Sequence, residues 1–81
     1  RVLPNYPDSA RAALAEGRVY VRLLVGADGR VVRIGRIAGP GVFHAAAATA
    51  ARQWEFVPAI QNDRPVRVWV DVPFRFELED R

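Results

Sequence analysis

The sequence predicts a small α+β domain with the element order α-β-β-α-β, and three observations support this. The chain has 81 residues, enough for a single domain over residues 1–81. Residues 66–78 alternate apolar and polar side chains over a run longer than the usual strand of about five or six residues. Two alanine-containing segments show apolar residues at helical spacing, and these complete the α+β pattern.

The first helix is predicted to be short. Residues 3–7 are expected to be extended, because each of the two prolines in this segment pushes its predecessor out of the α region. Pro7 suits the first helical position, and Asp8 suits the positive end of the helix dipole. With Gly17 as its C-cap, the helix would have about two and a half turns. Its apolar positions would be Ala10, Ala13 and Leu14.

A hairpin is expected next. Residues 18–25 alternate as a half-buried strand does, and the Asp28-Gly29 pair tolerates the positive φ of a tight turn. The return strand over residues 30–37 is less regular. It places two apolar pairs on opposite faces, Val32 with Ile34 and Val31 with Ile37, and so predicts a bulge near Arg33 or Gly35.

The second helix is predicted over residues 42–53, after glycine and proline interrupt the sheet. Its small alanines would let the helix axis lie close to the sheet. Residues 54–58 are expected to leave the helix in an extended form, and residues 61–64 to form a polar loop. The inner face of this helix would consist of Phe43, Ala46, Ala47, Ala50 and Trp54.

The last strand, residues 66–78, is predicted to form an edge of the sheet. The simplest arrangement is a three-stranded antiparallel sheet in the order 2-1-3, with both helices on one face. Pro73 supports this independently, because a proline inside a sheet belongs on an edge or at a bulge. If Pro73 faces outward, the backbones of the other odd-numbered residues do so as well, namely Arg67, Trp69, Asp71, Arg75 and Glu77. Such an edge is either protected by its proline and charges or available for an added strand.

Five segments together resemble the C-terminal domain of TonB-family energy transducers, over essentially the whole chain. They are Leu3-Pro4-Asn5-Tyr6-Pro7, Glu16-Gly17-Arg18-Val19, Asp28-Gly29-Arg30-Val31, Trp54-Glu55-Phe56-Val57-Pro58 and Val72-Pro73-Phe74-Arg75-Phe76. The resemblance implies a periplasmic domain of a Gram-negative bacterium. It also implies that the chain is a fragment of a longer protein, anchored to the inner membrane by an N-terminal helix that is absent from it.

The resemblance further implies partners and a binding site. Family members bind the TonB-box segment of outer-membrane transporters as a strand added to the last strand, and an inner-membrane proton-driven complex supplies the energy. The well-known transducers have glutamine in place of Leu3 and of Asn5, and an apolar Leu3 cannot donate a side-chain hydrogen bond. The partner-binding residues carried over are Leu3, Asn5, Tyr6, Arg67, Trp69, Val70, Asp71, Val72, Pro73, Phe74, Arg75 and Phe76.

Two non-enzymatic alternatives remain open at this point. A structural or signalling module of the same fold could use the edge to form a homodimer. The net charge of +3, carried by arginines, also raises nucleic-acid binding, with Trp69 on a basic sheet face. The arginines are dispersed and interleaved with acids, which favours solvated faces and no nucleic-acid partner. Trp69 would either contact the partner or stack on Arg22 or Tyr20 of the first strand.

The sequence predicts no catalytic residues, cofactor or metal. Ser9 and Thr49 have no base and orienting group placed for nucleophilic catalysis. His44 is the sole histidine and there is no cysteine, so no set of ligands has the spacing of a metal site. No segment approaches the roughly 20 apolar residues of a membrane span.

Overall fold

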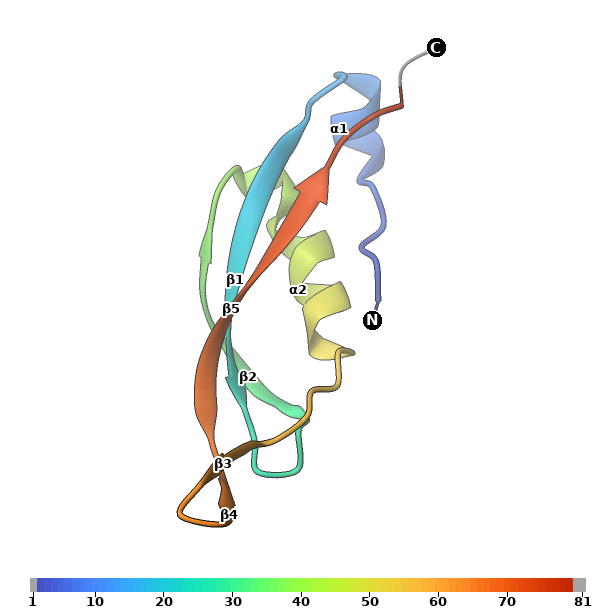
Figure 1. Ribbon diagram of the computed structural model, residues 1–81. Helices are drawn as coiled ribbons and strands as arrows, with labels where there is room; N and C mark the ends of the chain where they lie inside the picture. The colour runs from blue at the N-terminus through green and yellow to red at the C-terminus, as the bar shows by residue number, and fades with distance from the viewer. Residues whose placement is uncertain (1, 80–81) are drawn as a thin grey trace.

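The computed structural model describes residues 2–79 and has the predicted architecture. Strands β1 (Gly17–Val25), β2 (Val31–Ala38) and β5 (Val68–Phe76) form an antiparallel sheet in the order β2-β1-β5. Helices α1 (Asp8–Ala12) and α2 (His44–Arg52) lie on one side of this sheet (Figure 1). The predicted order 2-1-3 is therefore confirmed, and β5 is an edge strand.

The ladder between β1 and β5 is regular. Its register runs without a shift from Gly17 opposite Phe76 to Val25 opposite Val68. Val19, Val21 and Leu23 of β1 are fully buried beneath the helices. This unbroken alternation keeps each residue of β5 on the face that its odd or even number predicts.

Strand β2 is irregular, and the prediction for its faces was wrong in part. The register against β1 shifts at two places, between the partners of Val21 and Leu23 and between those of Leu24 and Val25. Each shift turns the strand over, so its half-buried residues recur every third position, at Val31, Ile34 and Ile37. Val32 is 47% exposed and does not share a face with Ile34. The predicted bulge is confirmed, near both of the positions named.

Helix α1 is shorter than predicted, and its end was misplaced. It stops at Ala12, and the chain then takes a positive φ of 56° at Leu14. Leu14 is 75% exposed, so the apolar spacing that placed it on the inner face was misleading. Gly17 is the first residue of β1 and does not cap the helix. Ala10 alone of the three apolar positions reaches the core.

The second helical segment agrees with its prediction. It begins as a 3-10 turn, η1 (Gly41–Phe43), and continues as α2. Phe43 is fully buried and stacks on Phe76 of β5, with ring centroids 4.2 Å apart. At the other end Trp54 packs edge-on against Phe74 of β5 at 5.3 Å. Of the alanines between them only Ala45 is exposed, and the others are buried or half-buried, so the helix lies directly on the sheet.

A second hairpin replaces the polar loop that the sequence predicted. Strands β3 (Ala59–Gln61) and β4 (Arg64–Val66) pair across Asn62 and Asp63, which both have positive φ. Positive φ at both central residues is the geometry of a tight two-residue hairpin turn. Val66 belongs to β4, so β5 is shorter than the predicted residues 66–78. The hairpin extends beyond the end of the main sheet (Figure 1).

None of the helices formed by residues 2–79 has the length and apolar character needed to cross a membrane.

Candidate functional site

The outer side of β5 is the candidate site, because its backbone groups point away from the sheet. Pro73 stands opposite Tyr20 in the ladder. In an antiparallel pair, opposite residues alternate between those that exchange two hydrogen bonds and those that exchange none. Pro73 has no N–H to exchange, so its pair is of the second kind. The backbone groups of Pro73, and of every second residue from it, therefore point outward.

We call this row the β5 edge. No strand among residues 2–79 pairs with β5 on the side away from β1. Arg67 lies between β4 and β5, and Glu77 follows the end of β5, so the regular row is shorter than the sequence predicted. The β5 edge consists of Trp69, Asp71, Pro73 and Arg75.

The side chains of β5 divide between two faces. The odd-numbered residues are exposed, while Val72, Phe74 and Phe76 are buried in the core. Val70 is half-buried. The even-numbered residues of the predicted partner-binding set therefore hold β5 on β1 and under the helices. Their side chains are not available to a partner at this edge.

Two contacts across the strands order the exposed side chains of the β5 edge. Asp71 stands opposite Arg22, and the carboxylate lies 3.3 Å from the guanidinium Nε. Trp69 reaches further, across β1 to β2. A Cβ atom on Gly35 would lie 2.8 Å from the Cζ3 atom of the Trp69 ring, and the guanidinium of Arg33 lies 5.5 Å from the ring centroid. The cation over the Trp69 ring is Arg33 and neither of the predicted stacking partners, Arg22 and Tyr20; the Cγ atom of Arg22 lies 3.6 Å from the same Cβ position on Gly35.

The opposite edge of the sheet, β2, differs in regularity. Its two register shifts twist the strand and interrupt the even spacing of its outward backbone groups. Bulges of this kind are a common way to block the addition of another strand. Of the two edges of the three-stranded sheet, β5 therefore offers the regular template.

The N-terminal segment runs beside β5 and is attached at both ends (Figure 1). The indole Nε1–H of Trp54 donates a 2.7 Å hydrogen bond to the carbonyl oxygen of Val2. The hydroxyl of Tyr6 donates to the carbonyl oxygen of Ala15, and its ring packs edge-on against Phe43 and Phe76. Burial, and to a smaller extent the charge of Glu16, raise the pKa of the Tyr6 phenol above 10.0.

Leu3 and Asn5 point to a different surface from Tyr6. Together with α2 they line a groove of about 370 Å³, and Leu3 is 83% exposed. Thus the structure brings the edge residues of β5 together, but it places Leu3 and Asn5 in the groove beside α2 and Tyr6, partly buried, against the core.

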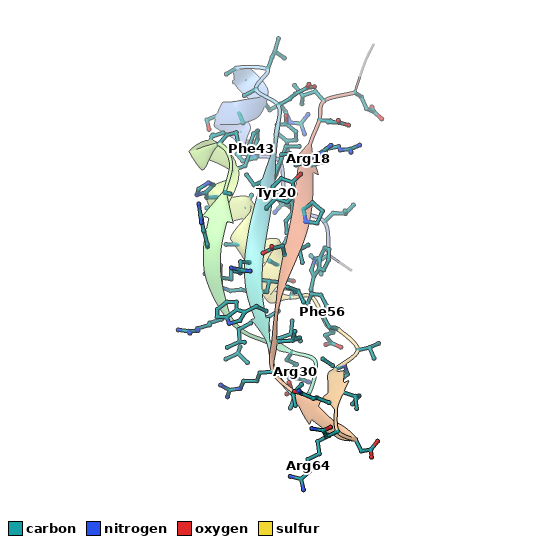
Figure 2. All side chains as sticks on the ribbon, turned by 60° about the vertical axis from the view of Figure 1, so that its left-hand side comes forward. Arg18, Tyr20, Arg30, Phe43, Phe56 and Arg64 are labelled. Carbon is teal, nitrogen blue, oxygen red and sulfur yellow. The ribbon has the colours of Figure 1, made fainter. Side chains whose placement is uncertain are left out.

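The face of the sheet away from the helices carries a cluster of arginines that sequence reasoning treated as dispersed. Figure 2 shows Arg18 and Tyr20 projecting from β1 on this face. The Tyr20 hydroxyl accepts a 3.5 Å hydrogen bond from Arg18, and this contact raises the already high pKa of Arg18. The alternation of β1 places Arg22 beside them, but the irregular strand β2 concealed the positions of Arg33 and Arg36.

Residues 2–79 contain no group of three or more histidine, cysteine, aspartate or glutamate side chains placed to hold a metal ion. The Nε2 atom of His44 lies 2.8 Å from the carbonyl oxygen of Gly39, at the start of α2. This contact gives the histidine a structural role between the sheet and the helix.

Comparison with known proteins shows the family to which this sequence belongs. The family model for the C-terminal part of the Gram-negative bacterial TonB protein matches residues 2–78. The chain is 35% identical to protein tonB2 of Pseudomonas aeruginosa over 77 residues. The matched region covers 93% of this chain and 28% of that protein. The chain is also 32% identical to protein TonB of Vibrio cholerae over 81 residues. This match covers 98% of the chain and 33% of that protein. The chain thus spans about a third or less of these relatives, and it belongs to the family of TonB C-terminal domains.

Proposed function

We propose that this domain is the periplasmic part of an energy transducer and binds the TonB-box segment of outer-membrane transporters. The segment would add to β5 as a further strand. An N-terminal helix upstream of the domain would anchor the protein in the inner membrane. A proton-driven complex there would supply the energy for uptake through the transporter. The domain itself would perform no catalysis.

The β5 edge is the observation that carries this proposal. Its outward backbone groups belong to alternate residues of a ladder without register shifts, so an extended peptide meets donors and acceptors at even spacing. Pro73 interrupts the row of donors once but leaves its carbonyl oxygen as an acceptor. The bulged edge of β2 lacks this regularity, which favours β5 as the binding strand.

The support beneath β5 also suits a strand that receives a partner. Phe74 and Phe76 pack against Trp54 and Phe43, so two aromatic contacts fix the strand to both ends of the second helical segment. A template that is already ordered loses little conformational entropy when a peptide binds. The peptide would bear most of that entropic cost.

A titration followed by NMR tests the proposal. The domain is mixed with TonB-box peptides from the outer-membrane transporters of the same organism, and with scrambled peptides of equal composition. We expect saturable amide shifts at Trp69, Asp71 and Arg75 with the authentic peptide only. Shifts that cluster on β2 or in the groove beside α2 would show that strand addition at β5 is the wrong mechanism.

The same titration separates transduction from homodimerisation at the edge. A domain that uses β5 to pair with its own copy would show concentration-dependent shifts at the β5 edge before any peptide is added. Sedimentation at increasing protein concentration gives the corresponding mass. A monomer that shifts only with peptide agrees with the proposal.

A further inference from the structure

The arginine-rich face of the sheet suggests a second binding surface, which meets the β5 edge at Asp71 and Arg75 but offers side chains and not backbone groups. We name it the outer face and define it by the exposed residues opposite the helices. It carries five arginines from three strands and two acids near its β5 side. The arginines are Arg18, Arg22, Arg33, Arg36 and Arg75, and the acids are Asp71 and Glu77.

The arginines of the outer face differ in how their charge is compensated. Arg22 is paired with Asp71 at 3.3 Å and Arg75 with Glu77 at 3.7 Å. Arg33 lies over the Trp69 ring and Arg18 on the Tyr20 hydroxyl. Arg36 forms no ion pair with a carboxylate of residues 2–79. Its guanidinium is therefore the group best placed to receive an external anion.

A shallow hollow of about 210 Å³ lies beside Arg36 in the middle of the outer face. Its lining consists of Tyr20, Arg22, Arg36, Ala38 and Asp71. The guanidinium groups of two arginines and a phenol hydroxyl line one space, together with the carboxylate of Asp71, which is already paired with Arg22. Guanidinium groups bind carboxylates through two parallel hydrogen bonds, which fixes both position and orientation.

We propose that the outer face binds an acidic segment of a protein partner, with a carboxylate side chain seated in this hollow between Arg22 and Arg36. Because the outer face has five arginines and only two acids, a partner with negative charge complements it. Binding at the outer face does not depend on the addition of a strand to β5.

The geometry favours a polypeptide over a nucleic acid as the occupant. Sheets that bind single strands of nucleic acid present open aromatic faces on which bases stack. Here the Trp69 ring already lies against Gly35 and under Arg33, and it is only 42% exposed.

The test uses poly-L-glutamate as the probe and oligouridylate of equal charge as its competitor, at low ionic strength. Each domain carries one reporter on either side of the sheet. The indole N–H of Trp69 lies on the outer face, whereas that of Trp54 is bonded to Val2 beneath the helices. We expect poly-L-glutamate to shift the signals of Trp69 and of the Arg36 side chain and to leave that of Trp54 unchanged.

Substitutions decide whether the hollow or the overall charge is responsible. Arg36→Gln should weaken poly-L-glutamate binding about threefold or more, while Arg64→Gln, with the same loss of charge on the distant hairpin, should change it little (Figure 2). Arg36→Lys keeps the charge without the two-pronged donor and should bind with intermediate affinity. An unchanged Trp54 signal shows that each variant is folded.

Two results would overturn the proposal. Equal weakening by Arg36→Gln and Arg64→Gln would mean that only net charge matters. Tighter binding of oligouridylate than of poly-L-glutamate would assign the face to nucleic acid. Because the hollow is formed by side chains, whereas strand addition uses the outward backbone groups of β5, neither result bears on strand addition.

Discussion

Gly35 of β2 makes room for the ring of Trp69 on β5, two strands away across the sheet. A Cβ atom at this position would stand 2.8 Å from the Cζ3 atom and 3.2 Å from the Cη2 atom of the ring. Carbon atoms in contact normally lie about 3.5–4.0 Å apart. The Trp69 ring can therefore occupy this position because residue 35 has no Cβ atom.

Gly35→Ala should displace the Trp69 ring without unfolding the domain, because the clash falls on the far end of an exposed side chain. The signal of the Trp69 indole N–H is expected to move, and that of Trp54 to stay. The change in stability should remain within about 1 kcal/mol, as for most surface substitutions. If the Trp69 signal does not respond, the ring does not lie against Gly35.

Proline substitutions on β5 should separate the inward from the outward backbone row. Val70→Pro removes an N–H that points to β1 and leaves the carbonyl of Leu23 opposite it without a donor, at a cost of about 1–3 kcal/mol. Asp71→Pro removes an outward N–H and an exposed ion pair, which together should cost less than about 1 kcal/mol. Its main effect should be on peptide binding.

Urea denaturation and a peptide titration of both variants measure these two effects. Asp71→Asn is the control, because it removes the carboxylate and keeps the N–H. Peptide affinity that falls as far in Asp71→Asn as in Asp71→Pro would attribute the loss to the side chain and not to the backbone. Equal destabilisation by the two prolines would reverse the odd and even assignment.

Gly29→Ala should strongly destabilise the domain. Gly29 has a φ of 85°, and a Cβ atom there would stand 2.0 Å from the carbonyl oxygen of Phe56. The backbone conformation alone costs a non-glycine residue about 1–3 kcal/mol. Gly41→Ala is the matched control, because no heavy atom lies within 4 Å of its Cβ position. Thermal unfolding of the pair should show a much lower Tm for Gly29→Ala, and similar values would contradict the contact with Phe56.

Phe43→Ala should remove much of the stability of this domain. Its ring is fully buried against Phe76 and Tyr6, and truncating a buried phenylalanine costs about 3–5 kcal/mol. Small domains have about 5–15 kcal/mol in total. Val42→Ala, at a neighbouring position 44% exposed, should have little effect in the same denaturation experiment. A mild effect of Phe43→Ala would mean that the N-terminal segment and β5 are held by other contacts.

Stability should fall at alkaline pH because of Tyr6. The pKa of its phenol is raised in the folded chain, so folding favours the protonated form. The stabilisation is complete below the unfolded value of 10.0 and is lost as pH rises through the folded value. Tyr6→Phe cannot ionise at this position and should show a smaller loss of stability above pH 10.0 than the parent chain. Parallel curves for the two proteins would argue against this assignment.

The fold was largely predictable because its main signals are long and local. The alternation in the last strand, the Asp28-Gly29 turn and the alanine stripe of the second helix each depend on a short stretch of chain. Together they predict the sheet order and the outward position of Pro73. The sequence therefore predicts the outward position of Trp69, Asp71, Pro73 and Arg75, but it extends the row too far at both ends, to Arg67 and Glu77.

The features that sequence missed depend on tertiary contacts. Leu14 fits a helical pattern, but the chain turns at that residue into β1. The double bulge of β2 exposes Val32, places Arg33 opposite Leu24 and brings Arg36 to the same hollow as Arg22, which no regular strand pattern predicts. Asn62 and Asp63 have a composition typical of a tight turn, but the sequence alone predicts only a polar loop there and not the pairing of β3 with β4. Leu3 and Asn5 lie on α2 because Trp54 and Tyr6 fix the segment at its two ends.

Amide hydrogen exchange along β5, with and without a TonB-box peptide, is the most direct test of strand addition. In the free domain, Val70, Val72 and Phe74 should exchange slowly because their N–H groups point to β1, while Trp69, Asp71 and Arg75 exchange fast. The peptide should slow these three outward amides and leave the inward ones as they were. Outward amides that still exchange fast in the saturated complex would contradict the proposed binding at the β5 edge.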